Sequence, residues 1–335
     1  MQRGQTEVQR LTLERGDPRV PCAYAATLKD RWGRQLQSCG AMVPYAPRHL
    51  CPNCGNRLVK SNPATPGEGA RVIDGNVAIT DAATGKVVAV HLVCATDLAT
   101  DLAASLGQVK FDDQIFSQHT TTSRLNGMAS THRTFGYQPP VPMRRRYGCS
   151  RSQFNSEYPK AMDQITQLCR VAEHVFRTQA SDVHDLTAQR VREAISPAWL
   201  IAGTPWSSGI INKTVSLPYH RDQANVSSSW SAMLVCRRQV EGAMLHLADY
   251  DTYLATPHGS ITIFDGQSIT HGVTPLRMLS PAAFRYSIVT YAKVGMKKCC
   301  PDPRDEARRA ALEATEAEDK RAAGYKVARK PRRYA

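Results

Sequence analysis

The chain has 335 residues, with 43 lysines and arginines against 29 aspartates and glutamates, which gives a formal net charge of +14. A hydrophobic fraction of 42% is typical of a globular protein and excludes a disordered or collagen-like chain. No stretch has the roughly 20 consecutive apolar residues of a membrane span, and the first 20 residues lack the apolar segment of a signal peptide. We therefore expect an intracellular protein whose cysteines are mostly reduced and whose partner is a polyanion such as nucleic acid.

Residues 1–62 form a basic region with four cysteines, Cys22, Cys39, Cys51 and Cys54. The segment from Cys51 to Cys54 has C-x-x-C spacing and is followed by glycine, which resembles a zinc knuckle. Cys22 and Cys39 would complete a structural zinc site, in which His49 could replace either of them; free thiols are the alternative. The sequence SNPATPGEGA that follows predicts a linker.

Residues 70–300 begin with a predicted hairpin that turns at Gly85, followed by a helix that starts at Thr96 or Asp97. A second helix is predicted from about Tyr158 to Thr178, because its apolar residues recur on one face. From Ile211 onward, short alternating or apolar runs separated by turn residues predict the strands of an antiparallel sandwich or barrel. Three cysteines in apolar runs are expected in the core: Cys94, Cys169 and Cys236.

Residues 301–335 predict a charged, alanine-rich helix followed by the basic tail KVARKPRRYA. Cys299 and Cys300, just before this region, are expected to cap or pack. Residues 1–62 contain ten basic and four acidic side chains, and residues 320–335 contain seven basic and no acidic ones. The positive charge therefore lies mainly at the two ends of the chain, and both ends are candidates for holding a polyanion.

The segment LPYHRDQANV contains His220 and Asp222 two residues apart, which on a strand would place both side chains on one face. His271 follows 49 residues after Asp222, beyond an apolar strand, and Arg285 begins a further strand. Two histidines and one carboxylate are the facial triad of non-haem Fe(II) oxygenases. Arg285 and Ser287, again two residues apart, could bind the distal carboxylate of 2-oxoglutarate.

The alternative to this metal site is a structural role for its histidines, or other histidines as the ligands. A histidine taken alone is more often structural than a ligand, and His246 and His258 lie in the same stretch. Neither of those two has a carboxylate partner at the right spacing, so the order His220, Asp222, His271 is favoured. Gly266 and Gly272 would supply the turns that a histidine at a strand end needs.

These segments resemble the TET/JBP family of Fe(II)- and 2-oxoglutarate-dependent nucleobase dioxygenases. The resemblance covers about residues 85–300 and is most specific in LPYHRDQANVSSSWSAMLVCRRQVEGAMLHLADYDTYL and in GSITIFDGQSITHGVTP with FRYSIVTYAKVGM. It implies an α+β protein with a double-stranded β-helix core of the jelly-roll, cupin-like type and flanking helices, beside the small zinc module. It also implies that His220, Asp222 and His271 bind iron, and that Arg285 and Ser287 bind 2-oxoglutarate.

The resemblance further implies that the protein oxidises the 5-methyl group of 5-methylcytosine in double-stranded DNA. The alternatives are thymine hydroxylation, oxidation of another nucleic-acid base, a catalytically inactive DNA-binding relative, and ascorbate in place of 2-oxoglutarate. Family members place a base-contacting side chain at the position of Asn225. Candidates for stacking on a flipped base are Phe135, Tyr137 and Trp206, and candidates for phosphate contacts, with a solvated basic loop as the alternative, are Arg144, Arg145 and Arg146.

The same interpretation gives expectations for the oligomeric state and the cellular location of the protein. We expect a monomer that is not secreted. It would act in the nucleus of a eukaryotic cell, or in the cytoplasm of a bacterial cell, including one infected by a virus.

Overall fold

The computed structural model describes residues 7–21, 41–44, 63–111 and 131–323. The helices in this part of the chain are α1 (Thr96–Leu106), α2 (Gln153–Glu157), α3 (Pro159–Gln179), α4 (Ser181–Ala194) and α5 (Pro303–Ala322), with the 3-10 turns η2 (Pro142–Arg144), η3 (Pro197–Trp199), η4 (Ala248–Tyr250) and η5 (Val294–Lys298). The strands before α4 are β1 (Gln9–Leu13), β2 (Arg19–Pro21), β3 (Met42–Pro44), β4 (Arg71–Ile73), β5 (Val77–Asp81), β6 (Val87–Val93), β7 (Thr131–Gln138) and β8 (Ser150–Arg151). Those after it are β9 (Ser208–Lys213), β10 (Leu217–His220), β11 (Ser231–Arg238), β12 (Val240–Gly242), β13 (Leu245–Leu247), β14 (Thr252–Leu254), β15 (Ser260–Phe264), β16 (His271–Val273), β17 (Leu276–Met278) and β18 (Phe284–Tyr291).

Two sheets carry the fold. The larger has nine strands in the order β1-β5-β6-β15-β11-β18-β9-β7-β8, and the smaller has five in the order β10-β16-β13-β14-β4, counted over the described residues. From β9 onward the chain passes back and forth between the sheets: β9, β11, β15 and β18 lie in the larger one, and β10, β13, β14 and β16 in the smaller one. This arrangement is a double-stranded β-helix, so the predicted core fold is confirmed.

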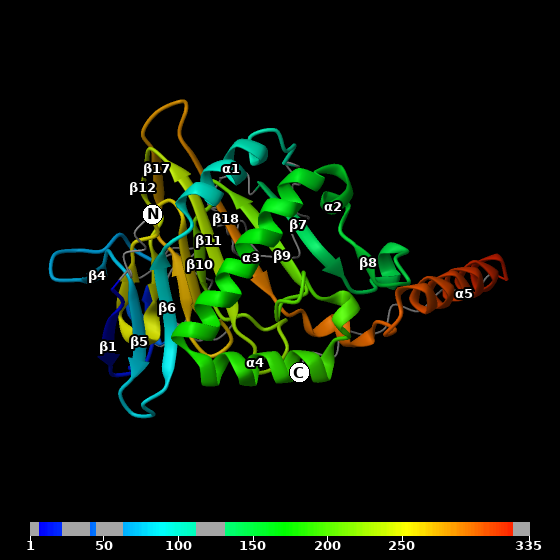
Figure 1. The fold of residues 1–335 in the computed structure, drawn as a ribbon, viewed down its shortest axis with the longest axis horizontal. Coiled ribbons are helices and arrows are strands. Elements are labelled where there is room, and N and C mark those ends of the chain that lie inside the picture. Colours follow the sequence, from blue (N-terminus) through cyan, green and yellow to red (C-terminus); the bar gives the residue numbers. More distant parts are fainter. Residues whose placement is uncertain (1–6, 22–40, 45–62, 112–130, 324–335) are drawn as a thin grey trace, which may run out of the picture.

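Helices α1, α2 and α3 cover the outer face of the larger sheet, whereas α5 projects away from it (Figure 1). The predicted helix that became α3 buries Ile165, Leu168 and Phe176 against that face, together with Ile261 and Ile288 from the sheet. A second hydrophobic cluster, which includes Met233, Leu245 and Val273, fills the space between the two sheets. Residues that alternate along an inner strand therefore point either to the helices or into the barrel, and the second group can build a site.

Two extensions enlarge the larger sheet beyond the eight strands of the barrel. On one side β1 pairs in parallel with β5, so part of the region predicted as a separate N-terminal module belongs to this sheet. On the other side β7 pairs with β9 and then with β8. The four cysteines of the predicted zinc site, Cys22, Cys39, Cys51 and Cys54, lie outside the described residues, and zinc binding there stays a prediction.

The C-terminal helix α5 is attached to the core by buried polar contacts. Glu306 is fully buried, and its carboxylate accepts hydrogen bonds from the backbone N–H of Cys149 at 2.7 Å and of Cys300 at 2.6 Å. Burial opposes ionisation of Glu306, but these hydrogen bonds and one from Arg309 outweigh it and lower the pKa of the carboxyl. The carboxylate therefore ties α5 to the turn before β8 and to the segment after η5.

The cysteines differ in part from the expectation of reduced thiols in the core. Cys149 and Cys299 form a disulfide, which corrects the prediction that Cys299 only caps or packs. Cys169 and Cys236 are buried as predicted, whereas Cys94 is exposed at the end of β6. The disulfide joins segments 150 residues apart in sequence, a contact that no local pattern could indicate. No helix in the described ranges has the length and apolar character needed to cross a membrane.

Candidate metal centre and co-substrate site

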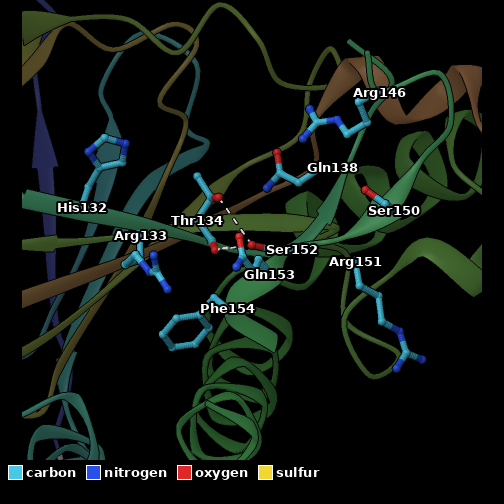
Figure 2. Close-up of a pocket in the computed structure, with 10 residues that line it drawn as sticks. All are labelled: His132, Arg133, Thr134, Gln138, Arg146, Ser150, Arg151, Ser152, Gln153 and Phe154. Atoms are coloured by element: carbon cyan, nitrogen blue, oxygen red, sulfur yellow. Dashed lines mark hydrogen bonds between the residues drawn. The ribbon is translucent and has the colours of Figure 1, made fainter. Parts of the chain in front are cut away.

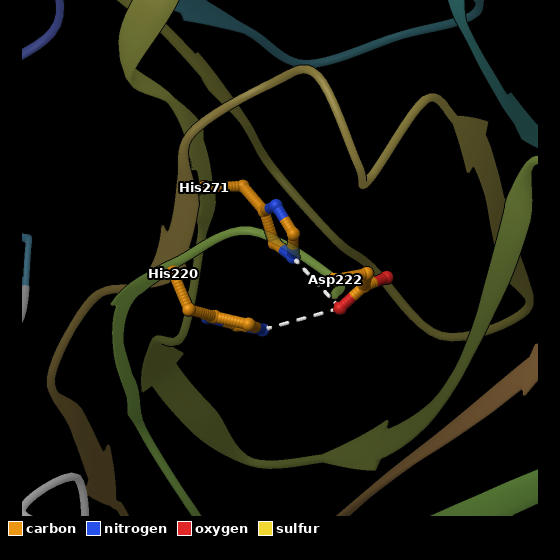
Figure 3. A group of neighbouring side chains, drawn as sticks. All are labelled: His220, Asp222 and His271. Atoms are coloured by element: carbon orange, nitrogen blue, oxygen red, sulfur yellow. Dashed lines mark ion pairs between the residues drawn. The ribbon is translucent and has the colours of Figure 1, made fainter. Parts of the chain in front are cut away.

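His220, Asp222 and His271 converge inside the mouth of the barrel (Figure 3). His220 ends β10 and lies directly opposite His271, the first residue of β16, which explains how two residues far apart in sequence meet. Asp222 follows just after the end of β10, so it is placed by a loop and not by the strand that the sequence predicts. Its Oδ1 atom lies 3.7 Å from Nε2 of His220 and 3.9 Å from Nε2 of His271.

The far side of each imidazole is held by a backbone carbonyl. Nδ1 of His220 lies 2.9 Å from the carbonyl oxygen of Pro218, and Nδ1 of His271 lies 2.9 Å from that of Ile269. Each Nδ1 must therefore carry the proton, which leaves Nε2 as a lone-pair donor. Metal-ligating histidines are oriented in this way in proteins, and the fixed tautomer agrees with a metal between the two Nε2 atoms.

The carboxylate of Asp222 is also oriented from behind. Its Oδ2 atom accepts hydrogen bonds from Ser231 Oγ at 3.0 Å and from Asn225 Nδ2 at 3.5 Å, and Oδ1 faces the histidines. Gly266 lies against the same oxygen, where a Cβ atom would come within 2.4 Å of Oδ2. Gly266 lies in the turn between β15 and β16, as predicted, and the close approach of Asp222 leaves no space there for a side chain.

The three residues fit a divalent metal. One ligand atom from each lies within 4.8 Å of the other two, and together they form a two-histidine, one-carboxylate donor set. The side chains of His220 and Asp222 are 25% and 22% exposed, whereas that of His271 is 7% exposed. A metal held here would accordingly be open to solvent from the side of His220 and Asp222, which is where further ligands could enter.

Arg285 and Ser287 lie on β18 and point into the barrel, because Tyr286 and Ile288 between and beside them belong to the core under the helices. Arg285 is only 1% exposed, and its one hydrogen bond within the described residues is a long one, 3.3 Å from Nη1 to the carbonyl oxygen of Val215. Its Nε and Nη2 atoms are buried without a hydrogen-bond partner there. Burial, helped by nearby Arg237, lowers the pKa of Arg285 to about 9.

A buried guanidinium with two free N–H groups on one edge is matched by a carboxylate, which accepts two parallel hydrogen bonds. A buried cation without such a partner is costly, so the arrangement is understandable if an anionic ligand completes it. The distal carboxylate of 2-oxoglutarate fits this description. The sequence predicted both Arg285 and Ser287 for that role, and the structure places them on the required face.

Asn225, predicted to contact a flipped base, has its amide nitrogen turned toward Asp222 and Ser231. Its backbone pairs with that of Lys293, just after β18. Burial, and to a smaller extent the charge of Arg146, lowers the pKa of Lys293. Sequence reasoning did not select Ser231, although it lies only nine residues after Asp222 at the start of a strand.

Two predicted base-stacking residues are not at the site, and the prediction is corrected. Phe135 and Trp206 are both fully buried in the hydrophobic core beneath the helices. The ring of Phe135 packs on Gly209, where a Cβ atom would lie within 2.1 Å of it, and the indole of Trp206 donates to the carbonyl oxygen of Trp230. Arg144 and Arg145 are exposed on and beside η2, where phosphate contact stays a prediction.

Residues 141–294 match the Tet_JBP family, the oxygenase domain of the 2OGFeDO superfamily. The matched stretch contains the three candidate metal ligands and both residues of the co-substrate site. Residues 141–294, just under half of the chain, therefore resemble the oxygenase domain of the 2OGFeDO superfamily, and within it that of TET/JBP proteins.

Similar proteins fall into two groups. The bifunctional helicase and thymine dioxygenase JBP2 of Trypanosoma brucei brucei (strain 927/4 GUTat10.1) is 24% identical over 156 residues, which are 46% of this chain but only 14% of that protein. Among solved structures, NgTET1 in complex with 5mC DNA has a TM-score of 0.49 and 13% identity, covering 73% of this chain and 91% of its own. An oxidoreductase of the 2OG-Fe(II) oxygenase family from Burkholderia pseudomallei has a TM-score of 0.37 and 12% identity, covering 62% and 87%.

Proposed function

We propose that this protein uses Fe(II), dioxygen and 2-oxoglutarate to oxidise the 5-methyl group of 5-methylcytosine in DNA, giving 5-hydroxymethylcytosine. The observation that carries the proposal is the pairing of an oriented two-histidine, one-carboxylate set with the buried, unsatisfied guanidinium of Arg285, both inside the segment that matches the Tet_JBP oxygenase domain. The first is the ligand set of an iron oxygenase, and the second is an anchor for a dicarboxylate co-substrate.

The chain's residues have separate tasks in this reaction. His220, Asp222 and His271 would hold the iron, and Arg285 with Ser287 would hold the distal carboxylate of 2-oxoglutarate. When bound, iron and 2-oxoglutarate supply the oxidising power that a methyl C–H bond requires and that side-chain acids and bases lack. Ser231 and Asn225 keep Asp222 oriented, and the carbonyls of Pro218 and Ile269 keep both imidazoles in the ligating tautomer.

DNA as the substrate is supported by the names of the relatives, one a thymine dioxygenase and one solved with 5mC DNA. A methyl group inside a duplex must leave the base stack before it can reach a site inside a barrel, so base flipping is part of the proposal. Asn225, which donates to the candidate metal ligand Asp222, and Lys293, whose backbone pairs with that of Asn225, are the side chains that we assign to the polar edge of an extruded base.

The test is nucleoside mass spectrometry after the protein is incubated with Fe(II), 2-oxoglutarate and duplex DNA that is either methylated or unmethylated at cytosine. We expect 5-hydroxymethylcytosine from the methylated duplex and succinate in equal amount. The variant His220→Ala is the matched negative control. If the wild-type protein forms neither oxidised nucleoside nor succinate with any DNA, the proposal is wrong.

Thymine hydroxylation is the second candidate, favoured by the activity in the name of the relative JBP2. The same iron and 2-oxoglutarate residues would serve it, because thymine also presents a 5-methyl group. The assay separates the two: a thymine hydroxylase yields 5-hydroxymethyluracil nucleoside from the unmethylated duplex, whereas a methylcytosine oxidase leaves that duplex unchanged.

A further inference from the structure

A polar cavity beside strand β7, the β7 pocket, lies outside the metal and co-substrate sites (Figure 2). It has a volume of about 380 Å³, which lies within the usual range for ligand sites. Its wall is built by β7, β8 and the start of α2, and His132 lies at one end of it and Arg146 at the other. Three arginines line it, and none of its lining residues is an aspartate or a glutamate.

The three arginines are not equivalent. Arg133 is neutralised by an ion pair with Glu157. Arg146 and Arg151 have no carboxylate within ion-pairing distance in the part of the chain that the structure describes. Arg146 is half-buried, and its Nε atom, like the amide nitrogen of buried Gln138 beside it, has no hydrogen-bond partner among the described residues.

Unsatisfied donors of this kind are costly to bury, and here they sit among like charges. Burial together with Arg144 lowers the pKa of Arg146, and Arg146 in turn lowers that of Lys293. An anion in the β7 pocket would satisfy the donors and offset the repulsion at once. Guanidinium forks flanked by amide and hydroxyl groups match the oxygen atoms of a phosphate.

Paired strands of the larger sheet link the pocket to the oxygenase site. Ser287 of the co-substrate site pairs with Asn212 on β9, and Asn212 pairs with His132 on β7, so the three side chains form one row on the barrel-facing side of the sheet. At the other end, Arg146 lies close enough to influence Lys293, which pairs with Asn225. A strand whose base enters at Asn225 would thus pass the β7 pocket.

We infer that the β7 pocket binds a backbone phosphate of the nucleic acid next to the extruded base, with Arg146 and Gln138, whose side chains lie beside each other, as the contacting side chains. This inference rests on the proposed function, since it assumes a nucleic-acid substrate. It assigns strand binding to a recessed pocket and, among the three arginines that the sequence named for phosphate contact, selects Arg146 over the exposed Arg144 and Arg145. A phosphate held in a pocket fixes the position of the nucleic-acid strand along the protein, but it does not distinguish one base from another.

The test measures binding of a fluorescent duplex containing 5-methylcytosine to the full chain between about 50 and 200 mM salt. The variant Arg146→Gln should bind about tenfold more weakly, and the slope of log affinity against log salt should flatten by about 1, for the one lost phosphate contact. The control is Arg190→Gln, which removes a positive charge on the exposed surface of α4, where Arg190 pairs with Glu193. It should change the slope by much less.

Thermal unfolding of each variant identifies a loss of folding, and the single variant Gln138→Leu provides a second probe that leaves the charge unchanged. The inference is overturned if R146Q and R190Q have the same affinity and slope. Binding of inorganic phosphate alone separates the sources of the anion: phosphate binding that is lost in R146Q without any change in duplex affinity makes this a free-phosphate site and also overturns the inference. Succinate release by the wild type tests the oxygenase proposal separately, because it can fail while the change in salt slope persists.

Discussion

Glu306 on α5 and Arg285 on β18 are both buried charged side chains, but the protein satisfies the hydrogen-bonding groups of Glu306 and leaves those of Arg285 largely unsatisfied. Glu306 accepts hydrogen bonds from two backbone N–H groups and from Arg309, so the protein itself satisfies the charge. Arg285 has one long hydrogen bond, and its Nε and Nη2 atoms have no hydrogen-bond partner among the described residues. A buried charge that is fully satisfied indicates a structural role, whereas one left unsatisfied indicates a position that a ligand completes.

In each candidate metal-binding histidine, one ring nitrogen has a hydrogen-bond partner in the protein and the other is left for a ligand. Each histidine has its Nδ1 satisfied by a carbonyl and its Nε2 directed at Asp222 Oδ1. Substitution His220→Ala should lower iron-dependent succinate formation by more than about 100-fold, because it removes a ligand and not merely a supporting contact. His174→Ala, an exposed histidine of α3, is the matched control and should have no effect. Turnover that survives in H220A would contradict the assignment of the metal site.

Arg285→Met tests the unsatisfied charge directly. We expect KM for 2-oxoglutarate to rise about 100-fold, since the co-substrate would lose its buried charge partner. The free energy of unfolding of the ligand-free protein should not fall, because the change removes a buried cation that has little compensation. Steady-state kinetics and thermal unfolding measure the two effects.

Arg285→Lys sharpens this result, because it keeps the charge but not the two-pronged geometry, and it should give an intermediate KM. If R285M destabilised the protein as strongly as a core substitution while KM stayed the same, Arg285 would be structural in the way that Glu306 is.

Ser231→Ala and Asn225→Ala test the support behind Asp222. Each removes a donor to Oδ2, and outer partners of metal ligands typically contribute about 10- to 100-fold in metal affinity or activity. Iron affinity can be measured by titration under anaerobic conditions. Ser229→Ala is the control, since its buried hydroxyl donates to the carbonyl of Val226 and not to Asp222. Equal losses in S231A and S229A would show that general packing, and not orientation of the carboxylate, is responsible.

Glu306→Gln should have the smallest effect on catalysis and an effect on stability of about 1–3 kcal/mol, because the buried backbone donors lose a charged acceptor. Glu313→Gln is the matched control on the exposed side of α5. Chemical denaturation measures the difference, and KM for 2-oxoglutarate should be unchanged in both variants.

The pH dependence of the Glu306 contribution has a definite sign. Hydrogen bonding lowers the pKa of Glu306 in the folded protein below its ordinary value of 4.5. Its contribution is therefore fully present above about pH 4.5 and is lost as the pH falls through the folded pKa. The stability difference between wild type and E306Q should shrink at acid pH, and a difference that grew there would contradict the assignment.

Much of the site was predictable from the chain because it depends on local spacing. The two-residue interval from His220 to Asp222, and the same interval from Arg285 to Ser287, place pairs of side chains together whether the backbone is a strand or an adjoining loop. The run of short strands after Ile211 likewise predicted the barrel, and apolar spacing predicted α3. The register between β10 and β16 then brought His271 opposite His220.

Sequence by itself determined which residue types are available and at what intervals, and with them the barrel, the candidate metal ligands and the arginine proposed for the co-substrate. Only the tertiary structure decided which face of a strand is covered. Phe135 and Trp206 looked available for stacking, but the helices bury them, and Gly266 is needed because Asp222 approaches from a distant segment. The disulfide, the satisfied Glu306 and the row from Ser287 to His132 depend in the same way on contacts between residues far apart in the chain. Local periodicity carries no information about such contacts, because they are set by how the layers pack.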